Sequence, residues 1–310
     1  MALEEKQLKT PQVLLLGNGL NRAYQGTGWG ELIESIWTNK RIASQGVHDA
    51  PFPLQAVIAT DDSLNKKLKE KPDAFYGGES IDEIRAPIEQ LLDIRFDHIL
   101  TTNYSYEIER VACPSVGRDG KYCKKLMTHT NARNTAESKY LLHTYNQIPY
   151  KGFVNKIWHI HGEIRKPQSV VLGHYYYGNL LGRYIAELDK RKYGQELRQK
   201  KHMPPIMNSW IDAFIMGDVY VLGFGYDFSE LDMWWLLNRK KREKARHGKV
   251  IFYEPSFGQE LKLSLLDTYS VQIQNMGFRT ENPDYKAFYE LAISDIQERV
   301  KQAREEKTYG

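Results

Sequence analysis

Residues 13–22 read Val-Leu-Leu-Leu-Gly-Asn-Gly-Leu-Asn-Arg, a short apolar run that ends abruptly in two glycines. A segment with helical character, Trp29 to Trp37, follows soon after. This order is typical of the first strand and phosphate loop of a doubly wound nucleotide-binding domain, because glycine permits the tight turn and lets the backbone approach a pyrophosphate. Arg22 stands where the third glycine of the dinucleotide fingerprint would be, so an ordinary strand-to-helix turn is an equal alternative.

The composition narrows the class of protein. The chain has 310 residues, 41% of them hydrophobic, and can bury a large core. No apolar run is long enough to cross a bilayer and residues 1–6 lack the apolar core of a signal peptide, so a cytoplasmic protein is expected.

Two cysteines, Cys113 and Cys123, cannot supply a disulfide framework or a four-cysteine zinc site, and we expect no metal. The net charge of +4 is modest, and the basic clusters 190–201 and 239–246 are interpreted as solvated helix faces, with nucleic-acid contact left open.

Six segments rich in β-branched or apolar residues predict strands: Gln12–Leu16, His98–Thr102, Lys156–His161, Val219–Phe224, Val250–Tyr253 and Val271–Asn275. Polar or helical sequence follows most of them, which favours parallel strands joined by crossover helices. We therefore expect one α/β domain over residues 1–310, with a doubly wound, mostly parallel, Rossmann-like sheet. Helical insertions at about 40–95 and 174–216 are expected to form a cap beside the sheet, and an amphipathic helix over 285–306 is expected to pack on the fold.

Three further segments end a predicted strand in small, polar or titratable residues: 96–105, 157–162 and 221–232. In open α/β sheets, ligands bind in the crevice beyond the carboxyl ends of the strands. Together with the glycine loop after residue 16, these endings predict one ligand site.

Four short motifs occur in these endings, in this order: Gly17-Asn18-Gly19-Leu20-Asn21, Thr101-Thr102-Asn103-Tyr104, His161-Gly162, and Leu222-Gly223-Phe224-Gly225-Tyr226 with Asp232. Their order and spacing resemble the sirtuin superfamily, and more closely its bacterial branch of SIR2-like, NAD-consuming enzymes. The motifs are similar, respectively, to the sirtuin Gly-x-Gly loop, the Thr-Gln-Asn motif, the His-Gly pair with the catalytic histidine, and the late Gly-Tyr-Ser segment on the ribose and adenine side. The resemblance covers about residues 11–255.

The resemblance implies NAD as the substrate, with His161 and Asn103 as catalytic residues. It also implies that the dinucleotide contacts Gly17, Asn18, Gly19, Asn21, Thr102, Gly223, Gly225, Tyr226 and Asp232. Two departures from the family pattern bear on this assignment. Cys113 and Cys123 cannot form the two Cys-x-x-Cys pairs of zinc-bearing deacetylases, which favours the zinc-free branch, and Ser105 stands where an Asp commonly follows the second motif.

These residue types suit cleavage of the bond between nicotinamide and ribose. That reaction builds oxocarbenium-like charge on the sugar and needs orientation and a base for the attacking water. Histidine can be the base because its ordinary pKa lies near neutrality, and the Asn103 carboxamide can donate and accept hydrogen bonds at once. His159, two residues before His161 on the same strand face, is expected to be a hydrogen-bonded core histidine. Ser105 is the expected cap of a helix beginning near Tyr106.

Ordinary structural roles stay open for several of these residues. Asn18 and Asn21 could serve only the turn, and Asp227 and Asp232 could cap or complement a helix start instead of holding a ribose. His161 itself could be structural.

The predicted activity is that of an NAD+ glycohydrolase, which releases nicotinamide and ADP-ribose. The resemblance implies an antiphage defence effector that depletes NAD+, controlled by homo-oligomerisation or by a separate regulatory or sensor protein. Two alternatives are a regulatory module that binds NAD+ or ADP-ribose without turnover, and an enzyme that transfers ADP-ribose to a macromolecule.

Overall fold

The structure is a computed structural model. It describes residues 10–24, 26, 28–39, 47, 49–60, 64–70, 72–75, 80–121, 127–130, 139–189, 191, 207–243, 248–255 and 258–305.

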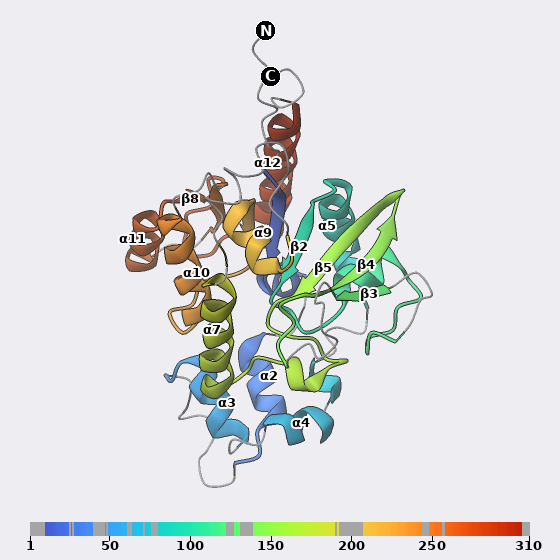
Figure 1. Ribbon diagram of the computed structural model, residues 1–310, viewed down its shortest axis with the longest axis vertical. Helices are drawn as coiled ribbons and strands as arrows, with labels where there is room; N and C mark the ends of the chain where they lie inside the picture. Colours follow the sequence, from blue (N-terminus) through green and yellow to red (C-terminus); the bar gives the residue numbers. More distant parts are fainter. Residues whose placement is uncertain are drawn as a thin grey trace.

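Among the described residues, one eight-stranded sheet forms the centre of the molecule (Figure 1), in the order β3-β4-β5-β2-β1-β6-β7-β8. The strands are β1 Gln12–Leu16, β2 His98–Thr101, β3 Met127–Thr130, β4 Thr144–Tyr150, β5 Phe153–His159, β6 Asp218–Leu222, β7 Val250–Tyr253 and β8 Val271–Gln274. The six strands from β5 to β8 pair in parallel. Their order, β5-β2-β1-β6-β7-β8, is the 3-2-1-4-5-6 order of a doubly wound fold. The predicted fold class and all six predicted strands are confirmed.

The sheet continues beyond β5 in a hairpin that the sequence did not predict. β4 and β5 are antiparallel and are joined by a two-residue turn at Lys151 and Gly152. Both turn residues have positive φ, 45° and 78°, as a type I′ turn requires. β3 adds antiparallel to β4. The sequence of β4, Thr-Tyr-Asn-Gln-Ile-Pro-Tyr, contains Asn and Pro, which are depleted in strands, so it lacks the apolar pattern that identified the other six.

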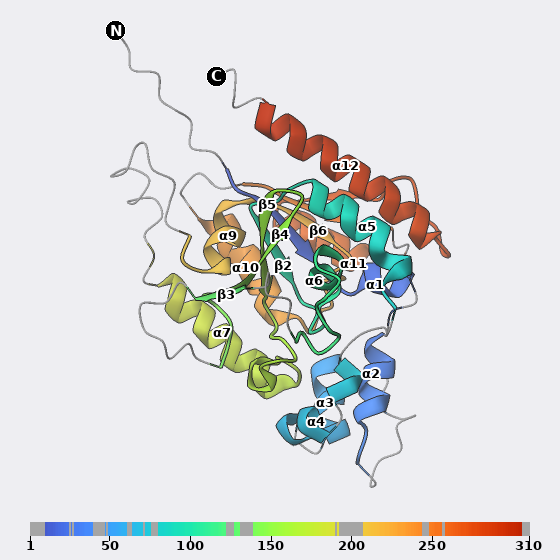
Figure 2. The ribbon, with the colours of Figure 1, turned by 90° about the vertical axis from the view of Figure 1, so that its right-hand side faces the viewer.

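Helices cover both faces of this sheet (Figure 2). On one face lie α12 (Tyr285–Glu305) and α5 (Asp82–Asp93), with α1 (Gly19–Ala23) and α6 (Glu107–Ala112) packed beside them. On the other face lie α9 (Trp210–Met216) and α10 (Leu231–Arg242), and α11 (Glu260–Thr268) packs against β8. The predicted C-terminal helix is confirmed as α12, up to residue 305.

A second group of helices lies beyond the carboxyl ends of the parallel strands (Figure 1). It comprises α2 (Trp29–Ile36), α3 (Phe52–Thr60), α4 (Leu64–Glu70), the 3-10 turns η2 (Pro72–Phe75) and η3 (Pro167–Ser169), and α7 (His174–Leu188). Because α3 packs against α2, α4 and α7, these elements form one cap over that edge of the sheet.

The cap contains only some of the helices that lie within the two predicted insertions. α5, within the 40–95 range, packs on α12, and α9, within the 174–216 range, packs against β2. All seven residues of α9 are buried, and its sequence Trp-Ile-Asp-Ala-Phe-Ile-Met is apolar around nearly the whole helix, which is typical of a core element. Within the predicted insertions, residues 40–46, 48, 61–63, 71, 76–79, 190 and 192–206 lie outside the described residues.

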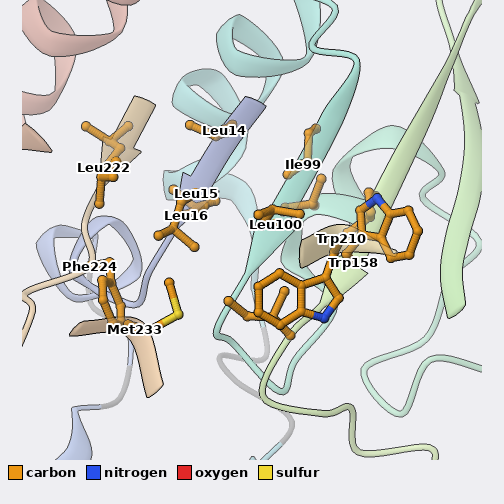
Figure 3. Packing of buried hydrophobic residues seen from close by; sticks show 14 of the residues in the cluster. Leu14, Leu15, Leu16, Ile99, Leu100, Trp158, Trp210, Leu222, Phe224 and Met233 are labelled. Atoms are coloured by element: carbon orange, nitrogen blue, oxygen red, sulfur yellow. The ribbon is translucent and has the colours of Figure 1, made fainter. Parts of the chain in front are cut away.

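The centre of the sheet carries the main core (Figure 3). Every residue of β1 is buried, and residues 14–16 pack beside Ile99 and Leu100 of β2 and Leu222 of β6. Such continuously apolar strands need cover on both faces. Helices give that cover, so ligand access remains at the carboxyl edge under the cap. In the part of the chain that the structure describes, no helix combines the length and apolar character needed to cross a bilayer.

Candidate active site

Two glycine loops meet where the strand order reverses. β1 leads into Gly17 and its neighbour β6 leads into Gly223. The backbone N–H of Gly19 donates to the carbonyl oxygen of Gly223 at 2.7 Å. A Cβ atom on Gly17 would lie 2.4 Å from that same oxygen, and Gly223 has φ of +68°. The contact between the loops therefore requires glycine at both positions, whatever ligand is present.

A cavity of about 1300 Å³ opens over these loops. Six of the predicted ligand residues line it: Asn18, Gly19, Thr102, Gly223, Gly225 and Tyr226. Small-molecule sites typically measure about 300–1,000 Å³, so this cavity has room for a ligand made of two linked halves. The crevice at a reversal of strand order is where doubly wound sheets bind nucleotides.

Two other predicted ligand residues lie outside the cavity lining. Gly17 and Asn21 are buried, and the carbonyl oxygen of Asn21 accepts hydrogen bonds from the backbone N–H groups of Tyr24 and Gly26. Both residues therefore serve the turn after β1.

His161 lies just beyond β5 and is fully buried, outside the cavity lining. Its Nε2 is 3.0 Å from Oδ2 of Asp232, which also accepts a hydrogen bond from the Tyr184 hydroxyl at 3.1 Å. An ionised carboxylate only accepts, so Nε2 carries the shared proton and Nδ1 is the atom left to take up another. Asp232 is itself fully buried. It pairs with His161 and does not line the cavity, so its contact with the dinucleotide stays a prediction.

Glu230 connects this pair with the cavity, because it lines the cavity and its carboxylate bonds the Tyr177 side chain. Ligand atoms of His161, Glu230 and Asp232 lie within 4.8 Å of one another, a spacing that suits proton exchange and would also suit a metal ion. The atoms Nδ1 of His161, Oε2 of Glu230 and Oδ1 of Asp232 are buried and have no hydrogen-bond partner among the described residues. Since buried polar atoms are ordinarily paired, this cluster has capacity for a water molecule or a ligand atom.

Burial and the neighbouring charges shift the pKa values of Glu230 and His161. Burial raises the pKa of Glu230 to about 7, and the nearby His161 opposes that shift. Burial disfavours the charged imidazole, but the carboxylates of Asp232 and Glu230 outweigh it and raise the pKa of His161. A carboxyl group that titrates near neutrality beside a histidine is suited to moving protons, and perturbed groups of this kind gather at functional sites.

Asn103 follows β2, whose neighbour β5 leads to His161. Its main chain is fixed on both sides, because the N–H donates to Oγ1 of Thr101 at 3.1 Å and the carbonyl oxygen accepts from Nδ1 of His159 at 2.8 Å. Its carboxamide makes no hydrogen bond to a described residue. The adjoining Thr102 lines the cavity and Asn103 itself does not, so Asn103 is one residue away from the lining and has a fixed backbone.

The predicted cap at Ser105 is wrong. Its hydroxyl donates to the Glu107 carboxylate at 2.7 Å, and α6 begins at Glu107 with Tyr106 at its N-cap and no side-chain cap hydrogen bond. Burial raises the pKa of Glu107, and the hydrogen bond from Ser105 opposes this. A buried carboxylate without a partner costs more than an uncapped helix end, so the hydroxyl goes to Glu107.

His159 is the hydrogen-bonded core histidine that the sequence predicted. It is buried, and its Nε2 pairs with Oε1 of Glu109 at 2.9 Å. Asn146 donates to the same carboxylate at 3.0 Å. Burial disfavours the charged ring, but Glu109 and then Glu163 raise the pKa of His159 to about 9. A buried imidazolium therefore holds the main chain of Asn103 in place.

Stability should fall with rising pH over the range set by His159. An unfolded histidine titrates near pH 6.5 and the folded one near pH 9, so this stabilisation is complete below about pH 6.5 and is lost as the pH rises through about 9. The shift corresponds to about 3 kcal/mol in the free energy of unfolding. Urea unfolding at these two pH values measures it. A His159→Gln variant should lose most of the difference, and an unchanged pH dependence in that variant would contradict the assignment.

The cavity also contains charged residues that the sequence did not assign to the ligand: Arg22, Glu31, Glu230, Glu254, Glu260 and Lys262. Glu230 lies within the segment 221–232, and Glu254 directly follows β7. Glu254 stands at a strand end and Glu230 directly precedes α10 within a segment already singled out, so the signal used for the four segments could have found them. Lys262 lies in α11, where no local pattern marks it.

Comparison with known proteins leaves the family open. No protein-family model matches this sequence, and no curated protein matches it. Among solved structures, the chain is similar to one described as a crystal structure of a Sir2 homolog–NAD complex. The two share 13% identity over 96% of this chain and 95% of the other, with a TM-score of 0.31. A similarity this low assigns neither a family nor a ligand, so the fold class rests on the strand order given above.

Proposed function

We propose that this protein is an NAD+ glycohydrolase that releases nicotinamide and ADP-ribose. The observation that carries the proposal is the hydrogen bond from His161 to Asp232, which leaves Nδ1 of His161 unpaired. The histidine lies close to Glu230, and Glu230 lines a dinucleotide-sized cavity. The sirtuin-like order of motifs in the sequence supports NAD+ over other nucleotides.

The strand ends favour one orientation of the dinucleotide. Across the carboxyl edge lie β5 with His161, β2 with Asn103, β1 and β6 with the glycine loops, and β7 with Glu254. Neighbouring strands are about 4.8 Å apart, so the three steps from β2 to β7 span about 14 Å. In this arrangement the nicotinamide ribose lies at β5 and β2, the pyrophosphate lies over the glycine loops near Arg22, and the adenosine lies at β7.

The reaction converts NAD+ and one water into nicotinamide, ADP-ribose and a proton. The bond from ribose C1′ to the pyridine nitrogen breaks, and its electron pair neutralises the charge of the departing nicotinamide. Water adds to C1′, and its proton passes to Nδ1 of His161 through Glu230, the member of the cluster that lines the cavity. Asp232 then stabilises the imidazolium, and the Asn103 carboxamide orients the water or a ribose hydroxyl.

Incubation of the purified protein with NAD+ tests the reaction. Nicotinamide and ADP-ribose should appear in equal amounts. NAD+ that binds the cavity and is recovered intact would contradict hydrolysis. Transfer of an adenine-labelled fragment to protein or nucleic acid would indicate ADP-ribosyl transfer instead.

Turnover should increase as the pH is raised through about 7. Only the ionised Glu230 carboxylate can accept a proton, and burial places its pKa at about 7. The raised pKa of His161 acts in the same direction. We expect kcat/KM for NAD+ to rise between about pH 5 and about pH 8, and a Glu230→Gln variant to be about 100-fold slower with a flattened acidic limb. A wild-type profile that falls over this range, or an identical profile in the variant, would argue against the role of Glu230.

A binding module without turnover is the second candidate function. The observation that favours it is the complete burial of His161, which does not itself line the cavity. Calorimetry separates the two functions. A module would bind NAD+ tightly in the wild type, and the wild type would release no nicotinamide. Release by the wild type alone would exclude the module.

The sequence resemblance also implies a setting for this activity, which we propose as antiphage defence through depletion of NAD+. Such an enzyme must be restrained until infection, by homo-oligomerisation or by a separate protein. Infected bacteria that express the wild type should lose NAD+ and stop phage growth, whereas cells that express His161→Ala should keep NAD+ and permit growth. Equal NAD+ levels and equal phage yield in the two strains would count against the role.

A further inference from the structure

We infer that Tyr289 of the C-terminal helix α12 binds the pyrophosphate of the dinucleotide, by donating a hydrogen bond from its hydroxyl to a phosphate oxygen. This inference rests on the proposed function, because it adds a binding residue for the same substrate. Tyr289 lies outside all four sequence motifs, 57 residues after Asp232.

The Tyr289 hydroxyl lies over the glycine loop that follows β1. A Cβ atom built on Gly19 would lie 2.6 Å from the oxygen of that hydroxyl, so the phenol closely approaches the main chain of the loop. Both residues line the cavity. Because Gly19 has no side chain, a ligand that lies over the loop meets the hydroxyl directly.

The hydroxyl is suited to donate to an anion. Tyr289 is only 4% exposed, and its hydroxyl makes no hydrogen bond to a described residue. Burial raises the pKa of Tyr289 and the nearby carboxylate of Glu254 raises it further, so the phenol keeps its proton at neutral pH. A buried donor without a partner is costly, and a phosphate oxygen is a strong acceptor that would satisfy it.

Arg22 supplies positive charge on the same side of the cavity. It lies in α1, directly after the glycine loop, and lines the cavity. Its side chain is exposed and forms no ion pair with a described carboxylate. Lys262, another cation in the lining, is already paired with Glu254 at 3.3 Å. Arg22 therefore attracts an anion to the loop, and Tyr289 adds a directed hydrogen bond.

The C-terminal helix holds the phenol in a fixed position. α12 begins at Tyr285 and packs beside α1 (Figure 2). The ring of the fully buried Phe288 meets the Tyr289 ring edge to face, with 5.2 Å between the centroids. Farther along α12, Asp295 accepts a hydrogen bond from the Tyr253 hydroxyl of β7 at 2.6 Å. Because the helix is anchored to the sheet, little conformational entropy is lost when the hydroxyl binds a ligand.

Binding of ADP-ribose tests this inference. Tyr289→Phe removes one oxygen atom and keeps the ring, so the variant should fold normally, which thermal unfolding checks. Its affinity for ADP-ribose, measured by calorimetry, should be lower by about tenfold or more, because a hydrogen bond to a charged group is a strong one. Tyr175→Phe, 64% exposed on α7 and outside the cavity lining, is the matched control and should keep the wild-type affinity. Unchanged affinity in folded Tyr289→Phe would overturn the inference.

Adenosine, which lacks the phosphates, distinguishes a direct contact from a structural role of the hydroxyl. Its affinity, measured by competition with ADP-ribose, should be the same in the wild type and in Tyr289→Phe. Equal weakening of adenosine and ADP-ribose would show that the hydroxyl acts through the protein structure and would overturn the inference. With NAD+ as substrate, Tyr289→Phe should raise KM and leave kcat unchanged, because the pyrophosphate is bound equally in the ground state and the transition state.

The binding measurements also separate this inference from the proposed reaction, because ADP-ribose requires no turnover. Weaker ADP-ribose binding in Tyr289→Phe, without nicotinamide release by the wild type, would support the role of Tyr289 and contradict hydrolysis. Hydrolysis by the wild type, with equal ADP-ribose binding in the two proteins, would support the reaction and overturn the role of Tyr289. Failure of the wild type to bind ADP-ribose and to release nicotinamide would overturn both.

Discussion

Replacement of His161 by alanine is expected to lower nicotinamide release about a thousandfold or more. General-base catalysis contributes about 10²–10⁴-fold, and the variant also leaves the buried Asp232 carboxylate without its imidazole partner. The measurement is kcat/KM for NAD+ with protein whose folding has been checked by thermal unfolding.

Two further variants make this result interpretable. His161→Gln keeps a side chain that can donate to Asp232 but cannot act as a base, so it should be folded and equally inactive. His174→Ala removes an exposed histidine at the start of α7 and should keep wild-type activity. Full activity in folded His161→Gln would remove His161 from the mechanism.

Replacement of Gly17 by alanine is expected to destabilise the protein by about 3 kcal/mol or more, enough to prevent folding in many small domains. The added Cβ would lie 2.4 Å from the carbonyl oxygen of Gly223, and this neighbour is backbone, so relief would require the two loops to separate. Urea unfolding or the yield of soluble protein measures the effect.

Gly225→Ala is the matched variant for this test. A Cβ at Gly225 meets no atom within 4 Å, so stability should change by less than about 1 kcal/mol. Because Gly225 lines the cavity, the methyl group should nevertheless weaken NAD+ binding where the pyrophosphate approaches the loop. The opposite pattern, a stable Gly17→Ala and an unfolded Gly225→Ala, would contradict the packing described for the two loops.

The parallel part of the sheet was predictable because each strand is a short apolar run that ends in glycine or polar residues. β1 illustrates this, since all five of its residues are buried between two layers of helices. β4 was not predictable from the same signal, because it pairs at the side of the sheet and tolerates Asn146 and Pro149. α9 could be recognised as helical but not placed, because only its contacts with β2 and α10 distinguish a core helix from a cap helix.

The sequence predicted which strand ends meet at the candidate site, but not how the side chains at those ends contact one another. His161 and Asn103 follow neighbouring parallel strands, and the carboxyl ends of such strands share one edge. The role of Asp232 was not predictable, because its partner His161 lies 71 residues earlier in the chain and a buried pair has no local signature. Likewise, nothing in the order of residues shows that Glu230 reaches the cavity while His161 does not.

A crystal structure of His161→Gln with NAD+ is the most direct test of the account. We expect the dinucleotide to lie across the carboxyl ends of β2, β1, β6 and β7, with ribose C1′ facing position 161 and the Asn103 carboxamide, and with the adenosine beside Glu254. Density for NAD+ in the reverse orientation, or at another surface while this cavity stays unoccupied at saturating NAD+, would contradict it.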